Sequence, residues 1–233
     1  MESPNFVPEG HMHESSQIPE SRRNFLASLG TTALVAGAAM TPSVAEAMPT
    51  FTSPDYGWLS TLKGKKHKQL FDVPSINDGF GLAYALNFLD VYNKLGVADK
   101  DLGVVVVLRH AGAAIAVNDS IWSKYKLGTM LNVSDPKTKM AAERNRWRNP
   151  QPGDLPLPGM QLDKLQARGV IVGVCDVALT FLSMGAAASG GVTPEEAKRE
   201  WVASLPAGAV VVPVGVIGVN QAQEKECTYC FGG

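Results

Sequence analysis

The side chain best suited to chemistry in this 233-residue sequence is the thiol of Cys175. It follows the apolar run 170–174, which is typical of a buried strand, and precedes a predicted helix. In open α/β sheets ligands bind beyond the carboxyl ends of strands, where the positive end of the next helix favours a thiolate. The neighbouring carboxylate of Asp176 acts in the opposite direction. The alternative is an inert buried cysteine, because free cysteine is among the most buried residue types.

Two further cysteines, Cys227 and Cys230, form a C-x-x-C motif near the end of the chain. A single pair cannot complete a four-ligand zinc site, so no metal site is predicted. Two interpretations remain open. The pair could form a small-ring disulfide that holds the chain end, or a dithiol that resolves an intermediate formed on Cys175.

His110 follows the β-branched run 104–108, so we expect it at the same sheet edge as Cys175. There it could orient a substrate or act as a base. The alternative is a polar loop residue at the end of a strand.

Asp78 and Gly79 stand between the first predicted strand and the first predicted helix. Segment 79–81 resembles half of a dinucleotide-binding fingerprint, but Tyr84 stands where the third glycine belongs. The helix start at this point could still bind an anion. The sequence has no P-loop, H-E-x-x-H or G-x-S-x-G motif, so phosphoryl transfer, zinc proteolysis and serine hydrolysis have no support, and no cofactor is predicted.

Segments with strand character alternate with segments of helical periodicity beyond residue 66. Strands are predicted over 67–73, 102–108, 170–174, 209–212 and 227–231, and helices over 79–95, 113–125, 159–167, 177–188, 193–205 and 214–223. The proline-rich stretch 131–158 is a predicted loop, whose middle, 136–148, could form a short surface helix. This alternation predicts an α/β fold with a mostly parallel five-stranded sheet and helices on both faces.

The N-terminal segment has the pattern of a twin-arginine export signal. Arg22 and Arg23 precede an Ala/Gly-rich apolar stretch of about a dozen residues, and 45–47 forms a small-x-small cleavage site. We therefore expect a removed signal peptide over 1–47, a linker over 48–66 and a folded domain over 67–233 in the periplasm. The alternatives are a retained signal anchor or a chance arginine pair before an alanine-rich helix.

Charge and cysteine content restrict the partners of the exported chain. A net charge of −1 gives no electrostatic case for nucleic acid, and the basic cluster 144–148 is predicted to be a solvated loop. No further apolar run reaches membrane-spanning length, so no membrane partner is expected once the signal is removed. Three cysteines in an oxidising compartment leave one thiol unpaired or paired between molecules.

The segments 165–175 (LQARGVIVGVC) and 205–211 (LPAGAVV), with Gln221 downstream, resemble the DsrE/DsrF-like family over roughly residues 66–231. The resemblance implies a parallel five-stranded α/β domain that tends to form homo- or hetero-oligomers. Active members carry a persulfide on a cysteine in the loop after a central strand, and Cys175 stands at that position. The neighbouring Asp176, the lack of a surrounding glycine-rich loop, the export signal and the C-x-x-C motif depart from the family pattern.

We expect a homo-oligomeric periplasmic sulfur-handling protein that carries sulfane sulfur as a persulfide on Cys175. Its partner would be a sulfur donor or acceptor protein, or a small sulfur compound, and whether it acts as a sulfurtransferase or only as a carrier is left open. One alternative is a non-catalytic module that holds a small ligand or metal between His110, Asp78 and Cys175. Another is a structural subunit of an exported complex.

Overall fold

A computed structural model describes residues 57–233 of the chain. The predicted export signal and residues 48–56 of the predicted linker lie outside this range. Five strands form one all-parallel sheet in the order β4-β3-β2-β1-β5, which confirms the predicted α/β fold with a parallel five-stranded sheet. The strands are β1 (His67–Val73), β2 (Leu102–Leu108), β3 (Ile171–Cys175), β4 (Val210–Val212) and β5 (Thr228–Phe231).

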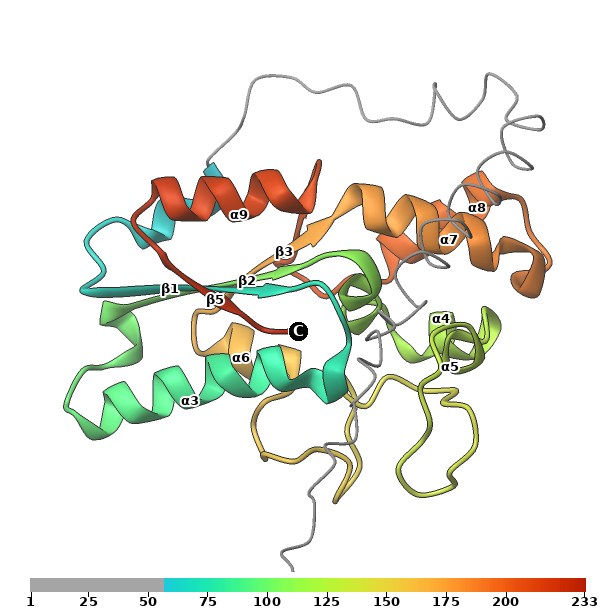
Figure 1. Cartoon of the computed structure of the whole chain (residues 1–233), viewed down its shortest axis with the longest axis horizontal. Coiled ribbons are helices and arrows are strands. Elements are labelled where there is room, and N and C mark those ends of the chain that lie inside the picture. Colours follow the sequence, from blue (N-terminus) through green and yellow to red (C-terminus); the bar gives the residue numbers. More distant parts are fainter. Residues whose placement is uncertain (1–56) are drawn as a thin grey trace, which may run out of the picture. The chain divides into compact units, whose positions relative to one another are not determined.

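Helix α9 lies along one face of the sheet, and α3 and α6 lie along the other (Figure 1). The α-helices are α3 (Phe80–Lys94), α4 (Asp119–Lys124), α5 (Leu127–Met130), α6 (Leu162–Ala167), α7 (Asp176–Gly190), α8 (Pro194–Ala203) and α9 (Gly215–Glu224). The 3-10 helices are η1 (Gly57–Leu62), η2 (Asn77–Gly79), η3 (Asp99–Asp101) and η4 (His110–Ile115). Within residues 57–233 no single helix has the length and apolar character of a membrane span. Only α7 and α8 taken together reach it, and they are bent by 112°.

The centre of the sheet is β2, whose residues are all buried. An unbroken β-branched run suits this position, because a strand of a parallel sheet is covered on both faces. Alternate side chains enter two separate apolar clusters. Val106 joins the larger cluster against α3 and α6, and Val105 and Val107 join the cluster against α9 and η1.

The strand order reverses between β3 and β4. The chain steps from β1 through β2 and β3 to β4 in one direction, and α9 then carries it back to β5 at the far edge. The connection that leaves β3 and the connection that leaves β4 therefore run in opposite directions across the sheet. In open α/β sheets the ligand-binding crevice lies at such a point. Cys175 ends β3 and Gly215 begins α9, so both lie at this crevice.

Part of the segment predicted as a linker, the 3-10 helix η1, belongs to the hydrophobic core. Leu59 and Leu62 are 1% and 2% exposed and pack in the cluster beneath α9. The folded domain therefore already includes Gly57, ten residues before the predicted start at His67. Burial of two leucines outweighs the polar, proline-punctuated character on which the linker prediction depended.

Two helix predictions between β2 and β3 are corrected by the structure. The predicted helix 113–125 is divided into η4 and α4, because the Asn118 side chain accepts the Ile121 N–H and caps a new helix. The predicted surface helix 136–148 is wrong, since this stretch contains turns and an isolated bridge that pairs Ser134 with Ala141.

The basic cluster 144–148 is not a solvated loop. Arg144 forms ion pairs with Asp135 and Asp154, and Arg148 donates to two backbone carbonyl oxygens of other segments. Burial lowers the pKa of Arg148 below its ordinary value. These arginines hold the long loop between α5 and α6 against the domain. Their position is therefore explained by contacts within the chain and needs no bound nucleic acid or other anionic ligand.

Candidate functional site

The Cys175 thiol lies between the starts of two helices. Its residue is 5% exposed and caps the N-terminus of α7. The sulfur accepts two backbone N–H groups, from Ala178 at 3.3 Å and from Gly215 at 3.1 Å. Both donors belong to first turns of helices, where unpaired N–H groups carry partial positive charge. This arrangement stabilises negative charge on the sulfur.

The Cys175 cavity has a volume of about 360 Å³, at the small end of the range for ligand pockets. The cysteine is buried from solvent but forms part of the cavity wall. The polar side chains of this wall are Arg109 and His110, and most of the remainder is apolar: Val177, Ala178, Phe181, Leu182, Val214 and Val216.

Arg109 directly follows β2 and connects the cavity to side chains of β1 and β5. Its Nε and one terminal nitrogen donate to the two carboxylate oxygens of Asp72 in β1, at 2.6 and 2.8 Å. The hydroxyl of Tyr229 in β5 donates to the same carboxylate at 2.9 Å, and Asp72 is 2% exposed. The Asp72 carboxylate raises the pKa of Arg109, so the guanidinium keeps its positive charge beside Cys175.

His110 takes a backbone conformation that is rare for residues other than glycine, with φ of +46°. Such strain occurs at functional sites that the surrounding structure holds in place. The remaining terminal nitrogen of Arg109 lies 2.8 Å from His110 Nδ1. Because a guanidinium can only donate, Nδ1 accepts and Nε2 carries the ring proton. In this arrangement the Nε2–H of His110 is a hydrogen-bond donor.

Asp78 and Gly79 do not join the Cys175 cavity. Asp78 pairs with Arg146 and lines a separate hollow of about 420 Å³. Gly79 is explained by packing, since it has φ of +80° and a Cβ there would lie 2.3 Å from Trp147 Nε1. The expectation of one ligand pocket formed jointly by His110, Asp78 and Cys175 is therefore wrong.

The carboxylate of Asp176, beside the thiol in sequence, is engaged elsewhere. Lys198 of α8 donates to it at 2.9 Å, and Asp176 is absent from the wall of the Cys175 cavity. The repulsion between the Asp176 carboxylate and a Cys175 thiolate that the sequence suggested is therefore offset by the positive charge of Lys198.

The C-x-x-C motif is neither a disulfide nor a partner of Cys175 in the structure. Cys227 and Cys230 are free thiols, and their side chains enter the clusters on opposite faces of the sheet. Burial raises the pKa of the Cys227 thiol to about 11, against a smaller opposing effect of Lys68, and burial also raises the pKa of Cys230. β5 is separated from β3 by three strand intervals, roughly 14 Å, which is beyond disulfide reach.

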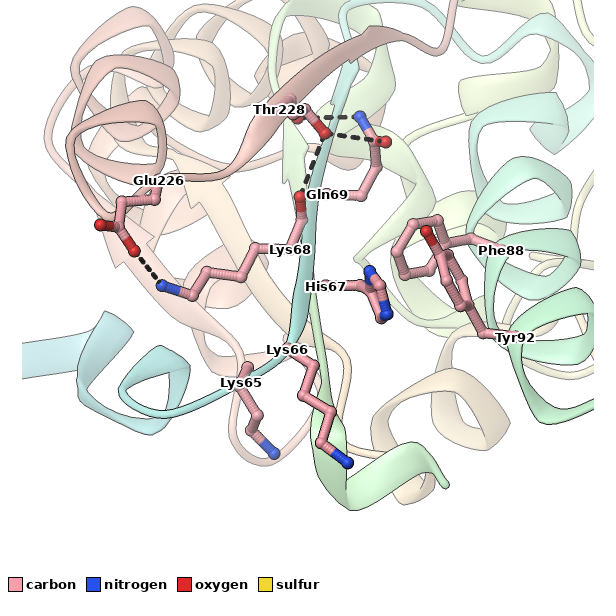
Figure 2. Close-up of a pocket in the computed structure, with 9 residues that line it drawn as sticks. All are labelled: Lys65, Lys66, His67, Lys68, Gln69, Phe88, Tyr92, Glu226 and Thr228. Atoms are coloured by element: carbon pink, nitrogen blue, oxygen red, sulfur yellow. Dashed lines mark hydrogen bonds and ion pairs between the residues drawn. The ribbon is translucent and has the colours of Figure 1, made fainter. Parts of the chain in front are cut away.

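A second hollow, of about 380 Å³, lies at the amino end of β1 (Figure 2). His67 stacks on Tyr92 with ring centroids 4.2 Å apart, and three lysines surround the strand. Lys65 and Lys66 point away from the stacked rings in Figure 2, and Lys68 pairs with Glu226. No thiol lines this hollow, whereas Cys175 forms part of the wall of the Cys175 cavity.

Three parts of the site were not predicted from the sequence: Arg109, the Asp72–Tyr229 pair that holds it, and Gly215. A signal existed for Asp72, because an acid inside an otherwise apolar strand needs a buried partner.

Among the described residues no group of three or more histidines, cysteines or acids is placed to hold a metal ion. No protein-family model, curated protein or solved structure matches the chain.

Proposed function

We propose that this protein carries sulfane sulfur as a persulfide on Cys175. The thiolate attacks the sulfane sulfur of a donor, a new S–S bond forms, and the bond from that sulfur to the rest of the donor breaks. The electron pair of the broken bond leaves with the donor remnant. An acceptor thiolate then takes the outer sulfur by the same exchange, so neither step needs an external oxidant.

The observation that carries the proposal is the pair of backbone N–H groups on Cys175 Sγ at the wall of a cavity. Fixed donors stabilise the negative sulfur without reorganisation during the reaction. His110 lines the same cavity, and with its Nδ1 bound to Arg109 its Nε2–H can donate to a departing thiolate. A structural cysteine requires none of these features.

Membership of the DsrE/DsrF-like family, export to the periplasm and homo-oligomer formation belong to the same proposal. The all-parallel five-stranded sheet and a cysteine at the end of an inner strand support the family assignment. The twin-arginine pattern supports export, by a route whose cargo is typically folded. Cys175 could therefore be loaded before export, which would protect it where disulfides normally form.

Mass spectrometry of the purified protein after exposure to polysulfide or thiosulfate tests the proposal. We expect a sulfur adduct on Cys175 that is absent from Cys175→Ser and retained in Cys230→Ser. An adduct pattern unchanged by Cys175→Ser would overturn the proposal. Absence of any adduct, with ligand-dependent stabilisation retained in Cys175→Ser, would favour a binding module instead.

A further inference from the structure

The Cys175 cavity has more room than an inorganic sulfur anion requires. Its volume of about 360 Å³ corresponds to about a dozen water molecules at their liquid density. A thiosulfate or short polysulfide placed at Cys175 Sγ would leave most of this volume unfilled. The remaining space must hold a further part of the donor or water.

The walls around this remaining space are apolar. Phe181 and Leu182 extend from α7, and Val214 and Val216 from the start of α9. Phe181 and Val216 are 56% and 55% exposed, so a ligand that contacts them removes apolar surface from water. Two large apolar side chains at the mouth of a pocket commonly mark a contact surface for a ligand.

Among the described residues that line the cavity, the one positively charged side chain is already paired with a carboxylate. Arg109 directs Nε and one terminal nitrogen to Asp72, and its other terminal nitrogen to His110 Nδ1. An inorganic dianion would therefore meet an ion pair and an apolar wall in place of an unpaired cation. Desolvation of such an anion is costly without a compensating charge.

We propose that the sulfur donor of this site is the persulfide of a small thiol with an apolar aliphatic or aromatic tail. This inference rests on the proposed function and specifies the donor class. The tail lies against Phe181 and Val216, and the outer sulfur lies at Cys175 Sγ. The Cys175 thiolate bonds to the outer sulfur, which keeps its hydrogen, and the apolar thiolate departs with the electrons of the broken S–S bond. His110 Nε2 donates a hydrogen bond to that departing thiolate.

A comparison of donors tests this inference. The full chain is treated with benzyl persulfide, glutathione persulfide or thiosulfate, and the rate of adduct formation on Cys175 is measured by peptide mass spectrometry. Each rate is divided by the rate at which a free small thiol reacts with the same donor. This normalisation removes differences in the intrinsic reactivity of the donors. We expect the normalised rate for benzyl persulfide to exceed that for glutathione persulfide by about tenfold, the selectivity typical of a small apolar pocket.

A matched pair of variants locates the selectivity. Val216→Asp places a charge at the cavity mouth, whereas Val91→Asp places it on α3, at a valine of nearly equal exposure, 52%. We expect Val216→Asp to remove the preference for benzyl persulfide and Val91→Asp to retain it. Equal loss of the preference in both variants would overturn the inference.

A binding measurement separates this inference from the proposed function. Cys175→Ser cannot form a persulfide but keeps the apolar wall, so we expect benzyl mercaptan to bind it by calorimetry. Adducts on Cys175 with equal normalised rates for all donors, or no binding of benzyl mercaptan, would overturn the donor class alone. Absence of an adduct from every donor would overturn the proposed function, and the donor class with it.

Discussion

The backbone N–H of Gly215 donates to Cys175 Sγ over 3.1 Å, although the two residues are 40 positions apart. This contact joins the end of β3 to the start of α9. A Cβ at position 215 would lie 2.6 Å from Arg109 Cβ and 3.2 Å from Cys175 Cβ. The absence of a side chain at Gly215 therefore lets the thiol, the guanidinium and the helix start lie together.

Gly215→Ala should slow sulfur loading of Cys175 by about tenfold or more, because the added methyl group displaces either Arg109 or the start of α9. Overpacking should also cost about 1–3 kcal/mol of unfolding free energy. The control is Gly185→Ala in α7, where a Cβ meets no atom within 4 Å. This control should load normally and gain about 0.5–1 kcal/mol of stability. Normal loading of Gly215→Ala would contradict the role assigned to this contact.

Asp72→Asn should destabilise the protein by about 3 kcal/mol, because it leaves the charge of Arg109 without its buried partner. Urea denaturation measures the loss. The matched control is Asp101→Asn. Asp101 lies 3.3 Å from the exposed Lys66 ammonium, and loss of this ion pair should cost less than about 1 kcal/mol. Equal losses in the two variants would show that the Asp72–Arg109 pair contributes no more than a surface ion pair.

The strands were predictable because their signals are local. Segments 67–73 and 102–108 begin and end at the same residues in the prediction and in the structure. A β-branched run bounded by turn-forming residues excludes most alternatives before any tertiary contact is known. His110 and Cys175 could be placed at one edge for the same reason, since parallel strands end together.

The loop between α5 and α6 was not predictable from such signals. The Asn145 side chain donates to the carbonyl oxygens of Ile115 and Val117 at 2.8 and 2.6 Å, across 30 and 28 residues. Hydrogen bonds at this separation replace the local pattern that a helix would show. The same loop places Trp147 over Gly79, which removes Gly79 from the candidate site for a reason that lies outside its own segment.

The C-terminal cysteines should not take part in sulfur loading. Cys227→Ala and Cys230→Ser should each load Cys175 at the rate of the unchanged protein, because neither thiol reaches the cavity. Native alkylation at pH 7 should leave Cys227 unmodified, and its modification should rise only as the pH approaches its pKa of about 11. Slower turnover of the Cys175 persulfide in Cys230→Ser would instead support a resolving role.

The loop between α5 and α6 also contains an ion-pair group whose stabilising effect should be lost in strong acid. The Asp154 side chain is fully buried, and Arg144 pairs with it and with Asp135. The hydrogen bond from Arg144 lowers the pKa of Asp154 below 3.8, opposed by burial and assisted by the Gln151 N–H. A carboxyl group with a lowered pKa in the folded state stabilises the protein above its unfolded pKa. That stabilisation is lost as the pH falls through the folded value.

Arg144→Gln should therefore destabilise the protein strongly at pH 7, by about 3 kcal/mol, because it leaves two carboxylates without their shared cation. The difference from the unchanged protein should narrow as the pH falls below 3.8, since the carboxylates become protonated and Arg144 loses its partners. Urea denaturation between pH 7 and pH 3 measures both effects. Arg199→Gln, at an exposed arginine of α8, is the control and should change stability by less than about 0.5 kcal/mol. A destabilisation by Arg144→Gln that stays constant down to pH 3 would show that the arginine acts by packing and not by charge.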